Sequence, residues 1–178
     1  VRIFKQVKDS LFIIFSDNEV VERNLTTEFI KRGFDHKRII FTAKLDRPSY
    51  MARYRVVDLF LDTSPCNAGT TASDALKMGV PLITLKGKSF NSREAASILN
   101  SINLPELITS TSEEYESLAI ELATNPEKLH AIKAKLNDNL STAPLYDTKL
   151  FTKNLESAYT QMYDRHHQGE EPEHIYVE

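Results

Sequence analysis

Short apolar runs alternate with amphipathic stretches along the first two thirds of the chain. The apolar runs predict five β-strands, at 11–15, 37–42, 58–63, 81–85 and 106–110. The first run, Leu-Phe-Ile-Ile-Phe, contains no polar position, which is typical of a strand buried on both faces. Helical periodicity predicts helices between these strands, at 18–34, 48–57, 71–78 and 91–102. The alternation predicts an α/β fold, a Rossmann-like parallel sheet flanked by helices.

After residue 110 the pattern predicts helices only. Three amphipathic segments follow one another, at 112–125, 126–140 and 148–168, and a polar, acidic tail occupies 169–178. No internal repeat, low-complexity tract or linker interrupts the chain. We therefore predict one domain over 1–178 with a helical C-terminal portion at about 112–168. The opening residues resemble the inside of a helix, so the chain is expected to be a piece of a longer protein.

A bend rich in small residues and hydroxyl groups lies between the third predicted strand and the next helix, at 64–71. In an open parallel sheet, ligands bind beyond the carboxyl ends of the strands, near helix N-termini. Gly69 would let a ligand approach the backbone, and Thr70 and Thr71 would add hydroxyl groups to the free N–H groups there. The bend could therefore hold a phosphate. Thr71 and Asp74 also fit a capping box, and the spacing alone favours that structural alternative.

Basic residues gather after the second predicted strand. Lys44, Arg47, Arg53 and Arg55 lie in a loop and short helix at the same carboxyl edge of the sheet. Such residues usually form a solvated helix face. Beside the hydroxyl-rich bend, they would instead form the second wall of a pocket for nucleotide phosphates.

Composition excludes several classes of function. The chain is 41% hydrophobic and 26% charged with a net charge of −3, which predicts a globular protein without bulk attraction to nucleic acid or acidic membranes. Cys66 is the single cysteine, so neither a disulfide framework nor a thiolate metal cluster is possible, and a reducing, cytoplasmic location is expected. The Walker and G-x-G-x-x-G patterns are absent. Asp58 and Asp62 share a strand face, but no metal-binding cluster accompanies them.

Five ordered motifs carry a resemblance to a known family. They are DLFLDT at 58–63, CNAGTTASDAL at 66–76, GVPLITL at 79–85, SREAASIL at 92–99 and LPELI at 104–108. In this order and spacing they resemble the donor-binding half of the O-GlcNAc transferase/SPINDLY glycosyltransferase family. The opening 1–15 and the segment 144–175 are also similar to that family, so the resemblance covers nearly the whole chain.

This resemblance implies the C-terminal, donor-binding half of a GT-B glycosyltransferase, in a bacterial member of the family. It implies an inverting, metal-independent transfer from a nucleoside-diphosphate sugar, with UDP-GlcNAc expected, to Ser or Thr hydroxyls of proteins. No cofactor is expected. The implied partners are the nucleotide sugar, protein acceptors, and the N-terminal catalytic half and tetratricopeptide repeats of the same chain. The general base is expected outside this segment.

The resemblance also implies roles for individual residues. Thr70 and Thr71 would receive the diphosphate, and Asp74 would hold the ribose, which reverses the preference for a capping box. Contacts with the base and ribose would fall on Leu45, Arg47 and Arg53. The long helix 148–168 is expected to expose an apolar stripe that includes some of Leu155, Tyr159 and Met162.

Two positions depart from the family pattern. Gly69 and Tyr50 both stand where histidine is common, and both changes remove polar groups aimed at the donor. An alternative is therefore a degenerate nucleotide-binding or protein-interaction module without transferase activity. A third possibility is another GT-B-like enzyme that acts on sugar nucleotides, such as an epimerase.

Overall fold

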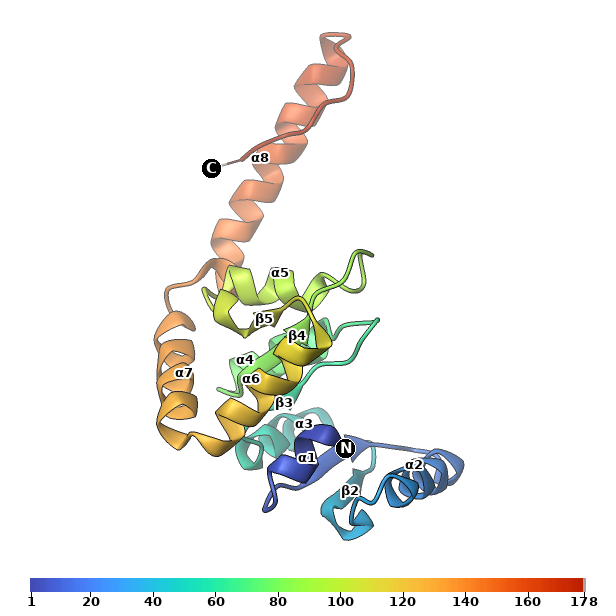
Figure 1. Cartoon of the computed structure of the whole chain (residues 1–178). Helices are drawn as coiled ribbons and strands as arrows, with labels where there is room; N and C mark the ends of the chain where they lie inside the picture. The colour runs from blue at the N-terminus through green and yellow to red at the C-terminus, as the bar shows by residue number, and fades with distance from the viewer. Residues whose placement is uncertain (178) are drawn as a thin grey trace.

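The computed structural model describes residues 1–177, which form short parallel strands surrounded by helices, with one long helix projecting from the body (Figure 1). The strands are β1 Phe12–Phe15, β2 Ile39–Thr42, β3 Phe60–Leu61, β4 Leu82–Leu85 and β5 Ile108–Thr109. The α-helices are α1 Arg2–Gln6, α2 Glu19–Lys31, α3 Arg47–Arg53, α4 Thr70–Lys77, α5 Glu94–Ser101, α6 Ser112–Thr124, α7 Pro126–Asn139 and α8 Thr148–His167. The predicted α/β class with a helical C-terminal portion is confirmed.

The strands form two separate parallel ladders rather than one continuous sheet. Strands β1 and β2 pair in register from Phe12 opposite Ile39 to Phe15 opposite Thr42. Strands β3, β4 and β5 form the second ladder, with β4 in the middle. Within residues 1–177 no backbone pairing joins β1 to β3. The prediction of a single parallel sheet is therefore corrected to two parallel ladders.

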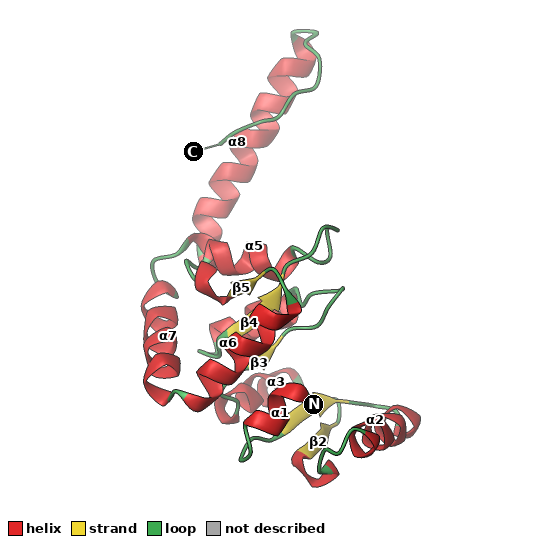
Figure 2. Ribbon diagram, viewed as in Figure 1, coloured by secondary structure: helices red, strands yellow, loops and turns green. Residues whose placement is uncertain are grey.

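The main hydrophobic core surrounds β4. Leu82 and Ile83 on this strand are completely buried, as are Leu76 of α4 and Leu99 of α5. Helices α4, α5 and α6 all contact β4 (Figure 2). Burial of one such side chain contributes about 1.5–3 kcal/mol relative to exposure, so this core holds the β3–α4 connection in place.

A smaller aromatic cluster supports the N-terminal ladder. Phe4, Phe12 and Phe34 pack together, with ring centroids 5.2–5.3 Å apart between Phe4 and the other two. The prediction that the run 11–15 is buried on both faces is wrong, because Leu11 is 58% and Phe15 is 50% exposed. Strand β1 has β2 as its one paired neighbour in the described part of the chain, and its other edge is open.

Several predicted boundaries shift by a few residues. Strand β3 covers 60–61 rather than 58–63, and β5 covers 108–109 rather than 106–110. Helix α4 begins at Thr70, one residue earlier than predicted. The predicted helix 48–57 ends as an α-helix at Arg53 and continues as a single 3₁₀ turn over 54–56.

Helix α8 extends away from the body, and the segment after it runs back alongside (Figure 1). Arg165 holds this return through ion pairs with Glu170 and Glu173. Leu155, Tyr159 and Met162 are all exposed, as predicted for an apolar stripe. The last residue of the predicted tail 169–178 lies outside the described residues. None of the helices in 1–177 is long and apolar enough to cross a membrane.

Candidate functional site

The N-terminus of α4 opens at the carboxyl edge of the β3–β5 ladder without a side-chain cap. Gly69 is the N-cap residue, and Thr70 and Thr71 are exposed. The N–H groups of residues 69–72 have no acceptor within the described chain, and Ser73 N–H is the first to bond, to Gly69 O at 3.1 Å. These free N–H groups and the positive end of the helix dipole favour an anion.

The capping-box alternative for this helix is wrong. Thr71 is the second residue of α4 rather than its cap, and the Asp74 carboxylate does not reach back to the helix start. Asp74 instead accepts hydrogen bonds from both terminal nitrogens of Arg47, each at 2.7 Å. The spacing of Thr71 and Asp74 therefore does not mark a helix cap, because Asp74 is used to bind Arg47.

The Arg47–Asp74 pair connects α3 to α4. Arg47 begins α3, which Asp46 caps by accepting a hydrogen bond from Ser49 N–H at 3.3 Å. The Asp74 carboxylate is nearly buried, whereas the Arg47 side chain is largely exposed. Hydrogen bonds from Arg47 hold the pKa of Asp74 below its usual range. Asp74 is therefore a fixed, ionised acceptor one helical turn from the free N–H groups of α4.

Substitution of Asp74 by Asn should make stability depend less on pH. Because the folded-state pKa of Asp74 is lowered, its carboxylate stabilises the fold above about pH 4, the ordinary unfolded value, and this contribution is lost as the pH falls through the folded-state pKa. Asp74→Asn should therefore lower the free energy of unfolding at pH 7, and the difference from wild type should shrink by pH 3. Urea unfolding at both pH values measures it. A difference that is constant with pH would contradict this role.

Tyr50 joins the basic residues of α3 to the start of α4. The Arg47 and Arg53 guanidinium carbons lie 5.4 and 5.1 Å from the centroid of its ring. Its hydroxyl lies 2.8 Å from the hydroxyl of Tyr54, which donates to Thr71 O at 3.3 Å. Burial raises the pKa of Tyr54, so this phenol stays a hydrogen-bond donor at neutral pH. Sequence reasoning did not single out Tyr54.

The structure brings most of the sequence-predicted residues together. Contacts link Arg47, Tyr50, Arg53, Thr71 and Asp74, and Gly69 and Thr70 adjoin Thr71 at the helix start. Leu45 lies in the loop between β2 and α3 with 44% of its surface exposed.

Asp62 is a residue whose importance the sequence did not reveal. Its buried carboxylate accepts hydrogen bonds from Thr63 N–H at 2.8 Å, Ala68 N–H at 2.8 Å and Thr84 Oγ1 at 2.6 Å. Burial raises the pKa of Asp62, although these three hydrogen bonds favour its ionised form. Tyr115 donates to its backbone oxygen at 2.9 Å. Asp62 thus fixes both ends of the loop that leads into α4, whereas Asp58 is exposed and pairs with Lys133.

Glu94 also lies at the α4 N-terminus, although it belongs to a different helix. It is the first residue of α5, and a Cβ atom added at Gly69 would overlap its carboxylate. Gly69 therefore leaves the space that the Glu94 carboxylate occupies. The residues next to 69 in the sequence could not reveal this contact, because Glu94 belongs to another helix. The carboxylate places negative charge beside the free N–H groups. Over residues 1–177, no group of three or more His, Cys, Asp or Glu side chains is arranged to hold a metal ion.

Comparison with known proteins assigns the family. The sequence model that defines glycosyl transferase family 41 matches residues 1–155 of this chain. The chain belongs to glycosyl transferase family 41. This assignment confirms the resemblance to the O-GlcNAc transferase/SPINDLY family.

Relatives in family 41 come from plants and animals. A probable UDP-N-acetylglucosamine–peptide N-acetylglucosaminyltransferase SEC from Arabidopsis thaliana is 35% identical over 98% of this chain and 18% of its own length. A UDP-N-acetylglucosamine–peptide N-acetylglucosaminyltransferase from Caenorhabditis elegans is 30% identical over 98% of this chain and 15% of its own. This chain thus spans less than a fifth of the length of these two relatives.

A solved family 41 structure has the same fold. A mutant of Thermobaculum terrenum O-GlcNAc transferase superposes with a TM-score of 0.86 at 29% identity, over 91% of this chain and 32% of that one. The parallel ladders and flanking helices therefore correspond to the Rossmann-like half of a GT-B glycosyltransferase.

Proposed function

We propose that this chain forms the donor-nucleotide half of a protein O-glycosyltransferase that takes its sugar from UDP-GlcNAc. The observation that carries the proposal is the uncapped α4 N-terminus, which lies one helical turn from the Arg47–Asp74 pair. The names of the family 41 relatives supply the donor and the peptide acceptor. Acceptors are Ser and Thr hydroxyls of proteins, and the remainder of the longer polypeptide holds them.

The diphosphate of the donor binds at the start of α4. Cleavage of the bond between sugar and phosphate leaves a nucleoside diphosphate whose negative charge grows in the transition state. The N–H groups of 69–72 are already fixed in position, so they stabilise that charge without reorganising. The exposed Thr70 and Thr71 hydroxyls add hydrogen bonds, and Arg47 and Arg53 add long-range attraction.

Asp74 accepts a hydrogen bond from a ribose hydroxyl. Each carboxylate oxygen has a second lone-pair direction beyond the one that Arg47 uses. The ion pair with Arg47 keeps the carboxylate charged and oriented, so it is preorganised for a neutral hydroxyl donor. Leu45 in the loop before α3 and Tyr50 within α3 complete the proposed contacts with the nucleotide.

The reaction proceeds with inversion and without a metal ion. Backbone N–H groups, the helix dipole and two arginines supply the positive charge that a divalent cation provides in other transferases. The general base that assists the acceptor hydroxyl comes from outside this chain, because the carboxylates near the α4 start already have other roles: Asp74 pairs with Arg47 and Asp62 holds the loop before α4.

The NMR spectrum of the labelled chain tests the location of the donor. Addition of UDP should shift the backbone amide resonances of Gly69, Thr70, Thr71 and Ala72 and the side-chain resonance of Arg47. Amides of α7, such as that of Ile132, should not move. Shifts confined to another face would refute this placement, and an unchanged spectrum would favour a module without donor binding.

Substitution of Glu94 by Gln should strengthen the binding of UDP. The carboxylate lies against Gly69 and repels an incoming diphosphate, and two unit charges about 4 Å apart in water interact by about 1 kcal/mol. Glu94→Gln should therefore lower the Kd for UDP roughly fivefold and leave uridine binding unchanged. Glu121→Gln, an exposed residue paired with Lys128, is the control. Unchanged UDP affinity in Glu94→Gln would place the diphosphate elsewhere.

A further inference from the structure

Glu94 has a partly buried carboxylate beside the start of α4. Its Cδ atom would lie 2.7 Å from a Cβ atom added at Gly69. Within 1–177 this carboxylate takes part in no hydrogen bond or ion pair, and the start of α5 has no side-chain cap. A carboxylate that leaves water without a partner is unfavourable, so this position suits a ligand that donates hydrogen bonds.

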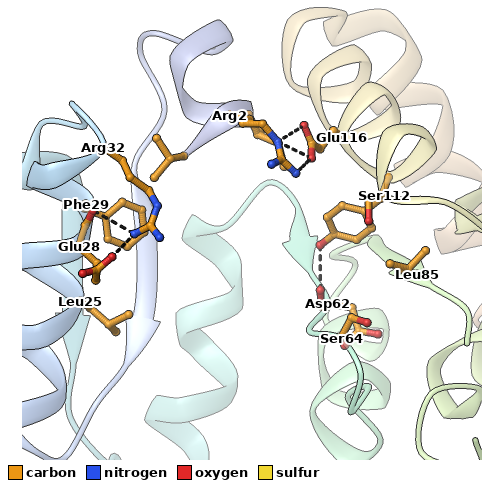
Figure 3. Close-up of a pocket in the computed structure, with 13 residues that line it drawn as sticks. Arg2, Leu25, Glu28, Phe29, Arg32, Asp62, Ser64, Leu85, Ser112 and Glu116 are labelled. Atoms are coloured by element: carbon orange, nitrogen blue, oxygen red, sulfur yellow. Dashed lines mark hydrogen bonds and ion pairs between the residues drawn. The ribbon is translucent and has the colours of Figure 1, made fainter.

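The charge of Glu94 acts on the loop that leads into α4. Asp62 lies in this loop, immediately after β3 (Figure 3). Burial, and to a smaller extent the negative charge of Glu94, raises the pKa of Asp62. Asn67 N–H donates to Asn91 O at 2.9 Å, which joins the loop to the segment that carries Glu94. Glu94 therefore belongs to the wall of the α4 start.

Gly69 and Asp74 lie on different sides of α4. Successive residues of an α-helix are turned by about 100°, so five positions separate their directions by about 140°. Arg47 of α3 reaches Asp74, whereas Glu94 of α5 reaches Gly69. Figure 1 shows α3 and α5 on opposite sides of α4. The free N–H groups at the helix start thus lie between a basic wall and an acidic wall.

The parts of a nucleotide sugar follow the same order as these walls. Its diphosphate stands in the middle, between the nucleoside and the sugar. With the ribose at Asp74 and the diphosphate at the N–H groups of 69–72, the sugar continues toward Glu94. A sugar presents neutral hydroxyl donors, and an ionised carboxylate can only accept. The acidic wall therefore matches the sugar.

Charge distinguishes the nucleotide sugar from the product of transfer. The terminal phosphate of UDP is a monoester, and such a group loses its second proton with a pKa of about 6. In UDP-GlcNAc the same phosphate is esterified to the sugar and lacks this charge. At neutral pH the Glu94 carboxylate therefore repels UDP more strongly than it repels UDP-GlcNAc.

We propose that Glu94 is a specificity-determining residue that favours the intact nucleotide sugar over the nucleoside diphosphate product. It accepts a hydrogen bond from a hydroxyl of the transferred sugar and repels the additional charge of the product. Gly69 contributes by leaving the space for the carboxylate. The inference rests on the proposed function, because it requires the diphosphate at the α4 start.

Calorimetric titration with UDP and with UDP-GlcNAc at pH 7.5 tests the proposal. In Glu94→Gln the Kd for UDP should fall, whereas UDP-GlcNAc loses a charged hydrogen bond together with the repulsion. The ratio of the Kd for UDP to the Kd for UDP-GlcNAc should therefore fall roughly fivefold. Glu121→Gln, whose carboxylate pairs with Lys128, should keep the wild-type ratio.

The two possible failures of this titration are distinct. An unchanged ratio in a Glu94→Gln protein that binds both ligands would overturn the role of Glu94 and leave the proposed function standing. Failure of the wild-type chain to bind either ligand would overturn both.

The methyl ester of the terminal phosphate of UDP separates the hydrogen bond from the repulsion. This ester has the phosphate charge of UDP-GlcNAc but no sugar. The wild-type chain should bind UDP-GlcNAc more tightly than the ester, and Glu94→Ala should reduce this preference roughly fivefold. An identical preference in both proteins would show that Glu94 does not contact the sugar, and the proposal would fail.

Gly69→Ala provides a second route to the same effect. The added Cβ atom would overlap the Glu94 carboxylate, which must move away, whereas alanine keeps the N–H group of residue 69. Gly69→Ala should therefore lower the ratio of the two Kd values as Glu94→Gln does. Combining the two substitutions should give no further change. Additive changes would show that the residues act separately and would contradict the proposal.

Discussion

Asp74→Ala is expected to weaken the binding of UDP by roughly 10- to 100-fold. A hydrogen bond to a charged acceptor contributes about 1.5–3 kcal/mol, and the variant removes the acceptor proposed for the ribose. It also releases Arg47, whose two hydrogen bonds to Asp74 fix the side chain beside the α4 start. Isothermal titration of wild type and variant with UDP gives the ratio of affinities directly.

Asp58→Ala is the matched control for this loss. It removes the same carboxylate group from an exposed position paired with Lys133, away from the start of α4. The control should bind UDP as wild type does. If Asp74→Ala retains full affinity and loses only stability, Asp74 serves to join α3 to α4 and does not contact the donor.

Asp62→Ala should produce the largest loss of stability, about 3 kcal/mol. The variant leaves the N–H of Ala68 and the buried hydroxyl of Thr84 without their acceptor, and each such group costs about 1–3 kcal/mol. UDP affinity should fall as well, because the loop 62–69 that leads into the α4 N-terminus loses its fixed shape. Urea unfolding and UDP titration measure the two effects.

Asp62→Asn separates the hydrogen bonds of Asp62 from its charge. The amide oxygen can still accept from Ala68 N–H, and the amide nitrogen can donate to Thr84 Oγ1. Because burial raises the pKa of Asp62, its ionised form costs stability at neutral pH, and Asn removes that cost. We expect Asn to stay within about 1 kcal/mol of wild type. Equal losses for Ala and Asn would show that the negative charge itself holds the loop.

Local patterns in the sequence predicted the order of the elements well. Apolar runs and helical periodicity depend on neighbouring residues, so the five strands and the helices between them were found within a few residues of their observed bounds. The exposed stripe of α8 followed from the same periodicity. By contrast, burial of β1 on both faces could not be judged from an apolar run, because burial depends on which strand lies beside it.

The site illustrates what spacing cannot provide. Thr71 and Asp74 have the spacing of a capping box, yet Asp74 is occupied by Arg47, 27 positions away in the chain. The residues alone placed Arg47 in a basic cluster beside a phosphate pocket, whereas only the resemblance to the family gave Asp74 a donor contact. Glu94 reaches Gly69 from another helix, and Asp62 joins separated parts of one loop to β4. Such contacts arise only when the chain folds.

Calorimetric titration of the chain with UDP tests the central claim most directly. The uncapped α4 start and the ionised Asp74 predict saturable binding with a Kd of roughly 0.1–1 mM, tighter than for uridine, and weakened roughly 10- to 100-fold in Asp74→Ala. UDP-GlcNAc should compete with UDP for the same site. Absence of binding heat at several millimolar UDP, in protein whose circular dichroism shows it folded, would contradict the assignment of this chain as a donor-binding half.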